Sequence, residues 1–108
     1  MSSARIPRQK SGRTLHTVLQ YYKLDGKVAV VASRGGTAQN PTWYENLVAN
    51  PECDVRIARV RHRAVARTAQ GDERTRWWEL ITREQPVQRE YQARTSRVIP
   101  VVILDPVS

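Results

Sequence analysis

A short run of the sequence combines residue types that suit an anionic ligand. It consists of Ser33, Arg34, Gly35 and Gly36. The serine offers a hydroxyl, the arginine a permanent positive charge, and the glycines let the backbone approach a ligand closely. Asn40 as N-cap and Pro41 in the first turn then predict the start of a helix, whose free N–H groups favour phosphate or carboxylate. We interpret residues 32–50 as a seat for an anion. The alternative is a strand–turn–helix connection whose glycines only make the turn.

A second set of candidate phosphate contacts lies near the start of the sequence, at Lys10, Ser11 and Gly12. An ammonium group, a hydroxyl and backbone N–H groups around a glycine can all bind a phosphate. Residues 1–9 are polar and basic without periodicity, so we expect a flexible arm there. The alternative for this stretch is a disordered start without function.

The helix predicted over residues 42–49 carries two further candidates. Trp43 and Leu47 form an apolar stripe, and Asn46 lies beside it. Trp43 is either a core anchor or a wall for a planar ligand. The two roles are compatible if the ligand is itself partly buried.

The remaining pattern predicts the elements that position these residues. Alternating residues indicate a strand over 14–24, and Asp25-Gly26 predicts a hairpin into a buried strand over 27–32. Strands are also expected over 53–68, with a bend near 58–61, and over 99–104. Helices are expected over 73–83, with Asp72 as N-cap, and over 86–94. Together they predict a single α+β or mainly β domain, a small twisted sheet or barrel with helices at its ends.

The composition narrows the classes of function. With 108 residues, 40% of them hydrophobic, the chain fits one globular domain. The single cysteine, Cys53, excludes an internal disulfide, and together with the missing signal-peptide pattern it favours a cytoplasmic protein. The net charge of +8 predicts an acidic partner, either nucleic acid, anionic lipid or a polyanionic small molecule. No nucleic-acid-binding motif is present, so we expect no nucleic-acid partner.

Motifs of the common enzyme classes are missing from the sequence. There is no Cys/His cluster with metal spacing, so no metal site is expected. The G-x-S-x-G, G-x-G-x-x-G and Walker A patterns are also absent. If the protein is an enzyme, we expect a cofactor to carry the chemistry.

Five segments in a fixed order resemble the deazaflavin-dependent nitroreductase family of actinobacteria. They are KSG at 10–12, ASRGG at 32–36, NPTWYENLVANP at 40–51, AR at 66–67 and YQARTSRVIPVVIL at 91–104. The resemblance implies a split β-barrel like that of flavin-mononucleotide-binding proteins. It also implies binding of coenzyme F420, an 8-hydroxy-5-deazaflavin with an anionic tail. The implied reaction is hydride transfer to a small hydrophobic acceptor such as a quinone, an enone or a nitro-aromatic compound.

The family motifs imply roles for particular residues of this chain. Cofactor contacts are implied for Lys10, Ser11, Gly12, Ser33, Arg34, Gly35, Gly36, Trp43 and Asn46. Tyr91 matches an aromatic position near the substrate side. Ser33 and Tyr91 are our candidate catalytic residues, as donors of a hydrogen bond to negative charge developing on the acceptor.

The chain also departs from the family pattern. We expect it to lack the family's N-terminal helix and first strand, which would leave a sheet edge open. Either another segment or a second subunit in a homodimer would then cover this edge, or the chain is a shortened member of impaired stability. Gln88 and Arg94 stand near Tyr91 where nitroimidazole-activating relatives carry aromatic residues, so efficient reduction of such prodrugs is not expected.

Flavin mononucleotide is the alternative cofactor. The alternative function is non-catalytic binding of the deazaflavin or of another amphipathic ligand, and association with a membrane is left open.

Overall fold

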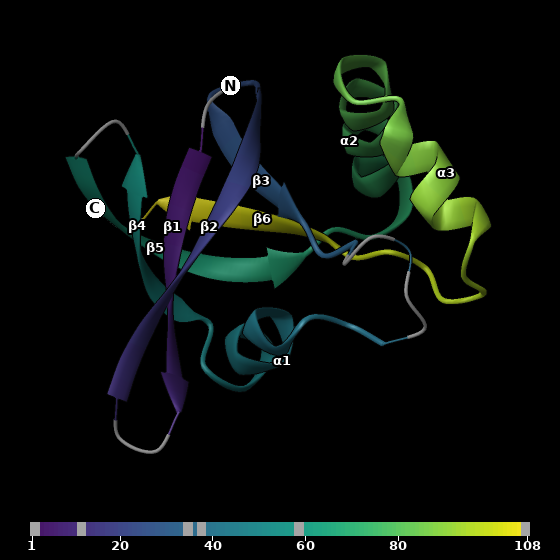
Figure 1. Ribbon diagram of the computed structural model, residues 1–108. Helices are drawn as coiled ribbons and strands as arrows, with labels where there is room; N and C mark the ends of the chain where they lie inside the picture. The colour runs from purple at the N-terminus through teal and green to yellow at the C-terminus, as the bar shows by residue number, and fades with distance from the viewer. Residues whose placement is uncertain (1–2, 11–12, 34–35, 37–38, 58–59, 107–108) are drawn as a thin grey trace.

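Six antiparallel strands in the described part of the chain close into a barrel in the order β1-β2-β3-β6-β5-β4 (Figure 1). In this computed structural model the described residues are 3–10, 13–33, 36, 39–57 and 60–106, with only the backbone described for 3–19 and 57. The strands are β1 (Ser3–Lys10), β2 (Arg13–Leu24), β3 (Lys27–Val31), β4 (Glu52–Ile57), β5 (Val60–Thr68) and β6 (Val101–Pro106). The helices are α1 (Thr42–Ala49), α2 (Gly71–Glu84) and α3 (Val87–Ala93).

The first strand corrects two expectations drawn from the sequence and selects one of the alternatives for the sheet edge. β1 pairs with β2 along its whole length, from Ser3 opposite Gln20 to Lys10 opposite Arg13, and it also pairs with β4. Residues 3–9 are therefore strand and not a flexible arm, and a strand does precede the KSG motif. Of the alternatives for the sheet edge, the structure shows coverage by another segment of the chain, which is β1. The sequence of β1 is polar and contains Pro7, so its local pattern gives no strand signal. The pairing comes from the strands on both sides.

The hairpin between β2 and β3 forms as predicted. Asp25 and Gly26 have φ values of 53° and 77°, the left-handed conformations that a type I′ turn needs at both central positions. The strands then pair from Leu24 opposite Lys27 onward. The bend expected near residues 58–61 falls partly outside the described residues, and β4 and β5 pair antiparallel on either side of it.

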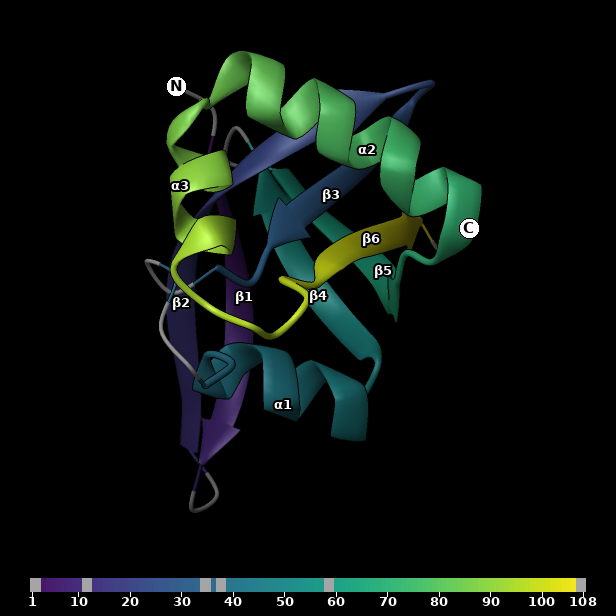
Figure 2. The same cartoon turned by 90° about the vertical axis from the view of Figure 1, so that its right-hand side faces the viewer.

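Two apolar clusters on opposite faces of β3 and β6 hold the fold together. The residues facing the barrel interior include Val30, Val102 and Leu104, and those facing outward include Ala29, Val101 and Ile103. The inner cluster includes Trp43 and Leu47 of α1, and the outer cluster includes Trp77 and Ile81 of α2. Figure 2 shows this layering, with α1 on one side of the strands and α2 and α3 on the other. Burial on both faces explains the uninterrupted apolar runs of these strands.

The helices lie close to their predicted ranges. α1 has the predicted bounds, and α3 lies within the range predicted for it. α2 begins earlier than predicted, with Gln70 at the N-cap position, so Asp72 lies in its first turn and does not cap it. An acidic side chain is also stabilising there because of the helix dipole. No helix among the described residues is both long and apolar enough to cross a membrane.

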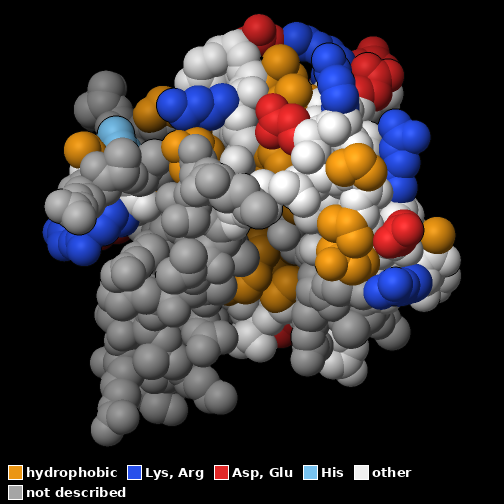
Figure 3. Space-filling view, turned by 45° about the horizontal axis from the view of Figure 1, so that its top comes forward, with side chains coloured by type: hydrophobic (Ala, Val, Ile, Leu, Met, Phe, Trp, Pro, Cys, Tyr) orange, Lys and Arg blue, Asp and Glu red, His pale blue; other side chains and the backbone are white. Residues whose placement is uncertain are grey.

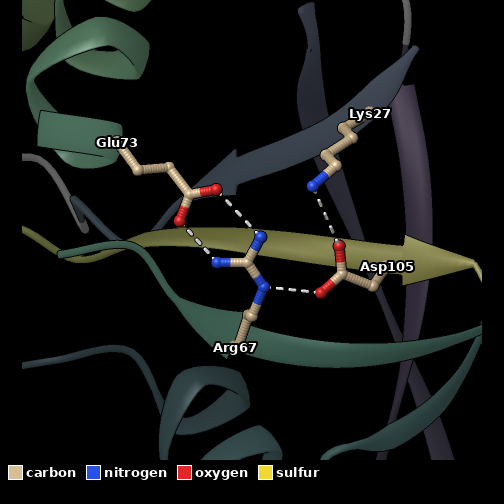
Figure 4. A network of polar contacts seen from close by, with 4 residues as sticks. All are labelled: Lys27, Arg67, Glu73 and Asp105. Carbon is tan, nitrogen blue, oxygen red and sulfur yellow. Dashed lines mark hydrogen bonds and ion pairs between the residues drawn. The ribbon is translucent and has the colours of Figure 1, made fainter. Parts of the chain in front are cut away.

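Arg67 of β5 links α2 and β6 through a single guanidinium group (Figure 4). Its Nη2 donates to Glu73 Oε2 at 2.9 Å and its Nε to Asp105 Oδ2 at 2.5 Å, while Lys27 Nζ lies 4.0 Å from the other oxygen of Asp105. The hydrogen bond from Arg67 lowers the pKa of Glu73, and the two carboxylates raise the pKa of Arg67. Because these side chains are partly exposed, water and salt screen the attraction, and the network mainly fixes the start of α2 against the barrel.

Candidate functional site

The connection between β3 and α1 carries the glycine-rich run that the sequence singled out. Ala32 N donates to Pro100 O at 3.0 Å, so this connection begins beside the start of β6. Gly36 N then donates to Ser33 O at 2.9 Å and closes a tight turn. Gly36 is buried and has a φ of 79°, a conformation that glycine adopts at no steric cost. The predicted strand–turn–helix geometry is therefore present, and its function depends on what lies against it.

Gly36 packs directly against the backbone of α3. A Cβ atom at position 36 would lie 2.5 Å from the carbonyl oxygen of Tyr91 and 2.9 Å from its Cα, closer than Cβ atoms come in proteins. The missing side chain at Gly36 therefore lets α3 rest on the connection. This contact brings the predicted acceptor-side residue, Tyr91, next to the predicted cofactor-binding turn.

Tyr91 stands in a polar setting on α3. It is partly buried, and the guanidinium carbon of Arg94 lies 5.6 Å from the centre of its ring, within the range of a cation–π contact. Gln88, one helical turn earlier, has a buried Oε1 without a hydrogen-bond partner among the described residues. The residues three positions before and after Tyr91 are therefore both polar.

Ser33 lies at the beginning of the turn and is partly buried. Its carbonyl oxygen accepts from Gly36 N and from Arg97 Nη2, the latter at 2.7 Å. Within the described part of the chain its hydroxyl has no hydrogen-bond partner. The backbone of Ser33 is thus held in place while its hydroxyl stays available to a ligand.

Arg97 is a residue of this region that sequence reasoning missed. Its Nη1 donates to Ala32 O at 3.1 Å and to Asn40 Oδ1 at 2.8 Å, in addition to the bond from Nη2 to Ser33 O. The prediction that Asn40 caps α1 is therefore wrong: its side chain binds Arg97, and the N-cap position is Pro41, without a side-chain cap. Arg97 and Asn40 are 57 residues apart in the sequence, so no local pattern could have indicated their contact.

The two candidates on α1 have different surroundings. Trp43 is 5% exposed, packs in the inner cluster and meets Tyr44 edge to face at 6.3 Å between ring centres. Trp43 is therefore a core anchor, and little of its ring is exposed to contact a ligand. Asn46 is partly buried, and its Nδ2 is enclosed without a hydrogen-bond partner among the described residues. An enclosed amide donor of this kind is stabilised by a ligand that accepts from it.

The other predicted phosphate contacts are only partly placed. Lys10 ends β1 opposite Arg13, while Ser11, Gly12, Arg34 and Gly35 lie outside the described residues. The hairpin of β1 and β2 extends past α1, away from α2 and α3, in both ribbon views (Figures 1 and 2). The phosphate-binding roles of these residues stay predictions.

Several basic side chains on the described surface lie beside acidic ones. In the face shown in Figure 3, the coloured Lys and Arg side chains alternate with Asp and Glu. Arg63 lies 3.3 Å from Glu52, and Arg76 lies 2.6 Å from Asp25. These pairs neutralise part of the positive charge on the described surface.

Cys53 is unsuited to nucleophilic chemistry. It is 5% exposed in the barrel interior, and burial, with a smaller contribution from Asp54, raises the pKa of its thiol to about 11. The thiolate is the reactive form, and at neutral pH this thiol is almost wholly protonated. Cys53 therefore serves as a small apolar residue of the core.

A family model described as F420H(2)-dependent quinone reductase matches residues 7–106, and the chain belongs to this family. A Mycobacterium tuberculosis relative, Rv3178, whose name gives the same activity as provisional, is 39% identical over 98 residues. That match covers 91% of this chain and 82% of the relative. The chain spans 66% of the length of three further Mycobacterium relatives, which are 35% identical.

Two solved structures share the fold at 36% sequence identity. One, described as a domain-swapped dimer, has a TM-score of 0.85 and is matched over 95% of this chain and 79% of its own. The other, an F420-H2 dependent reductase, has a TM-score of 0.83 and is matched over 96% of this chain and 92% of its own. The family and the fold class predicted from the motifs are confirmed.

Proposed function

We propose that this protein transfers a hydride from reduced coenzyme F420 to an activated acceptor. The observation that carries the proposal is membership of the F420H(2)-dependent quinone reductase family across residues 7–106. Quinones are the first acceptor class to test, and enones and nitro-aromatic compounds follow because each takes up a hydride at an electron-poor atom. The bound deazaflavin supplies the hydride, and the task of the chain is to place the reactants and exclude water.

The described residues around the β3–α1 connection fit such a cofactor. Asn46 Nδ2 is an enclosed donor that lacks an acceptor in the described structure, and the Ser33 hydroxyl is likewise free there. Gly36 lets α3 rest directly on the connection and so helps to fix its shape. We assign Ser33, Gly36 and Asn46 to the deazaflavin, with Trp43 supporting α1 from the core. Arg34, Gly35 and the KSG residues are proposed to bind its anionic tail.

Ser33 and Tyr91 are the proposed donors to the acceptor. Each carries a hydroxyl. The contact between Gly36 and the Tyr91 backbone brings the turn that begins at Ser33 next to the helix that carries Tyr91. A donor placed before the reaction stabilises negative charge as it develops, and loss of such a donor lowers kcat by roughly 100- to 1000-fold.

The test is turnover of reduced F420 with a naphthoquinone by the wild type, Ser33→Ala and Tyr91→Phe. Tyr44→Phe is the matched control, because it also removes a phenol hydroxyl, one that pairs with Thr68 at 2.8 Å. At least one site variant is expected to lose kcat by about 100-fold while the control keeps it. If Ser33→Ala and Tyr91→Phe both turn over like the wild type, neither residue is the donor.

The alternative is a protein that binds the deazaflavin, or another amphipathic ligand, without turnover. The two functions differ in one measurement, since a binder shows saturable affinity for the coenzyme but no oxidation of its reduced form with any acceptor class. Flavin mononucleotide is the alternative cofactor and is tested in parallel. The cytoplasmic location stays a prediction.

A homodimer is a further proposal, supported by the neighbour described as a domain-swapped dimer. The reason first given for it no longer holds, because β1 covers the sheet edge for which a second subunit was one of the alternatives. A dimer would therefore exchange an element instead of adding a strand. Light scattering on the purified chain tests this: a dimer has twice the chain mass of 12.4 kDa, and a monomer at all concentrations would contradict the proposal.

A further inference from the structure

We infer that Arg97 is a positioning residue that holds both ends of the cofactor-binding connection between β3 and α1. This inference rests on the proposed function, which makes the connection a cofactor-binding segment. It is argued from the hydrogen bonds that the Arg97 guanidinium donates. Those bonds reach Ala32 O and Ser33 O at the end next to β3, and Asn40 Oδ1 at the end next to α1. The segment between these anchors contains the glycine-rich run.

The geometry requires an arginine. Nη1 serves two acceptors at 3.1 and 2.8 Å, and Nη2 serves a third at 2.7 Å. A planar guanidinium presents several N–H donors in a fixed fork, whereas a lysine ammonium is a compact point charge on a flexible stem. Lysine at position 97 would keep the positive charge but would not form hydrogen bonds to both ends of the connection at once.

Arg97 is itself held by the helix that carries Tyr91. Gln92 Nε2 donates to Arg97 O at 2.7 Å, and Gln92 Oε1 accepts from Ile99 N at 2.9 Å. Arg97 N donates to Thr95 Oγ1 at 3.3 Å. The segment between α3 and β6 is thus tied at both sides of Arg97, so the guanidinium is a fixed support and not a mobile surface group.

Two independent contacts therefore join α3 to the connection. Arg97 and Gln92 form the polar link, and Gly36 resting on the Tyr91 backbone forms the packed one. The polar link fixes the distance between Ser33, on the cofactor side, and Tyr91, on the acceptor side. Small displacements of reacting groups are costly for hydride transfer, so the role of Arg97 is to keep these two sides in register.

The test compares Arg97→Lys and Arg97→Met with Arg67→Lys. The control removes an equally well-bonded guanidinium that joins β5 to α2 and β6. Fluorescence titration with oxidised F420 is expected to show binding at least about tenfold weaker in the two Arg97 variants and unchanged in the control. The thermal midpoints of Arg97→Lys and Arg67→Lys are expected to fall by similar amounts, so a loss of stability does not explain the difference in binding.

Hydrogen exchange of the cofactor-free protein gives a second readout. Backbone amides of residues 32–40 are expected to exchange faster in Arg97→Met than in the wild type, and those of α2 are not. Unchanged exchange in this segment, or binding in the Arg97 variants equal to that of the wild type, would overturn the inference. A wild type that binds no F420 while Arg97→Met still exchanges faster would refute the proposed function and leave the polar link standing.

Discussion

Substitution of Gly36 by alanine tests whether α3 rests on the cofactor-binding connection. Alanine at a φ of 79° costs about 1–2 kcal/mol of folding free energy, because its Cβ crowds the following carbonyl. The new Cβ would also meet the Tyr91 backbone at 2.5 and 2.9 Å, and neither backbone can move aside cheaply. Overpacking of this kind adds about 1–3 kcal/mol, so Gly36→Ala is expected to cost about 2–5 kcal/mol in total.

Gly26→Ala is the matched control for this prediction. Gly26 has nearly the same backbone conformation, with a φ of 77°, but a Cβ placed there has nothing within 4 Å. It therefore carries the conformational cost of about 1–2 kcal/mol without the steric one. Urea unfolding followed by tryptophan fluorescence measures both variants, and Gly36→Ala is expected to have a midpoint lower than that of Gly26→Ala by roughly 1 M. Equal midpoints for the two variants would refute the packing of α3 on Gly36.

Three further predictions concern the framework around the site. The pKa of Glu73 is lowered in the folded state, so its contribution to stability is present above the ordinary glutamate pKa of 4.5 and is lost as the pH falls below it. The stability advantage of the wild type over Glu73→Gln should shrink accordingly in urea titrations between about pH 6 and pH 3; an advantage independent of pH would contradict the Arg67 network. Cys53, with a pKa of about 11, should resist alkylation at pH 8 in the native state and react after unfolding, as mass spectrometry can show. Trp43→Ala should cost about 3–5 kcal/mol in urea unfolding, because it empties part of the barrel interior; a cost below about 1 kcal/mol would mean that Trp43 is not a core anchor.

Local chemistry made much of the fold predictable from the sequence. Asp25-Gly26 dictates a type I′ hairpin because both residues tolerate positive φ, and α1 was predicted with its observed bounds because its apolar stripe ends at Asn50-Pro51. The barrel topology was not predictable in the same way. β1 is polar and becomes a strand only through pairing with β2 and β4. Such pairing is decided by the rest of the sheet.

In the candidate site too, local motifs predicted some features, and tertiary contacts decided the others. The glycine-rich turn and the closeness of α3 to it involve residues that the motifs had already named. Arg97 was missed because its partners lie 57 to 65 residues away, and Asn40 was assigned to a helix cap that it does not form for the same reason. When a side chain has both a local and a distant partner available, the tertiary structure decides which of the two it binds. The local sequence therefore does not predict the hydrogen bond that forms.

The most direct test of the proposed function is a fluorescence titration of the purified chain with oxidised coenzyme F420, with flavin mononucleotide titrated in parallel. We expect saturable binding of the deazaflavin in preference to the flavin, and weaker binding in Ser33→Ala and in Arg97→Lys. Absence of binding to F420, or tighter binding of flavin mononucleotide, would contradict the proposal that this chain is an F420-dependent oxidoreductase.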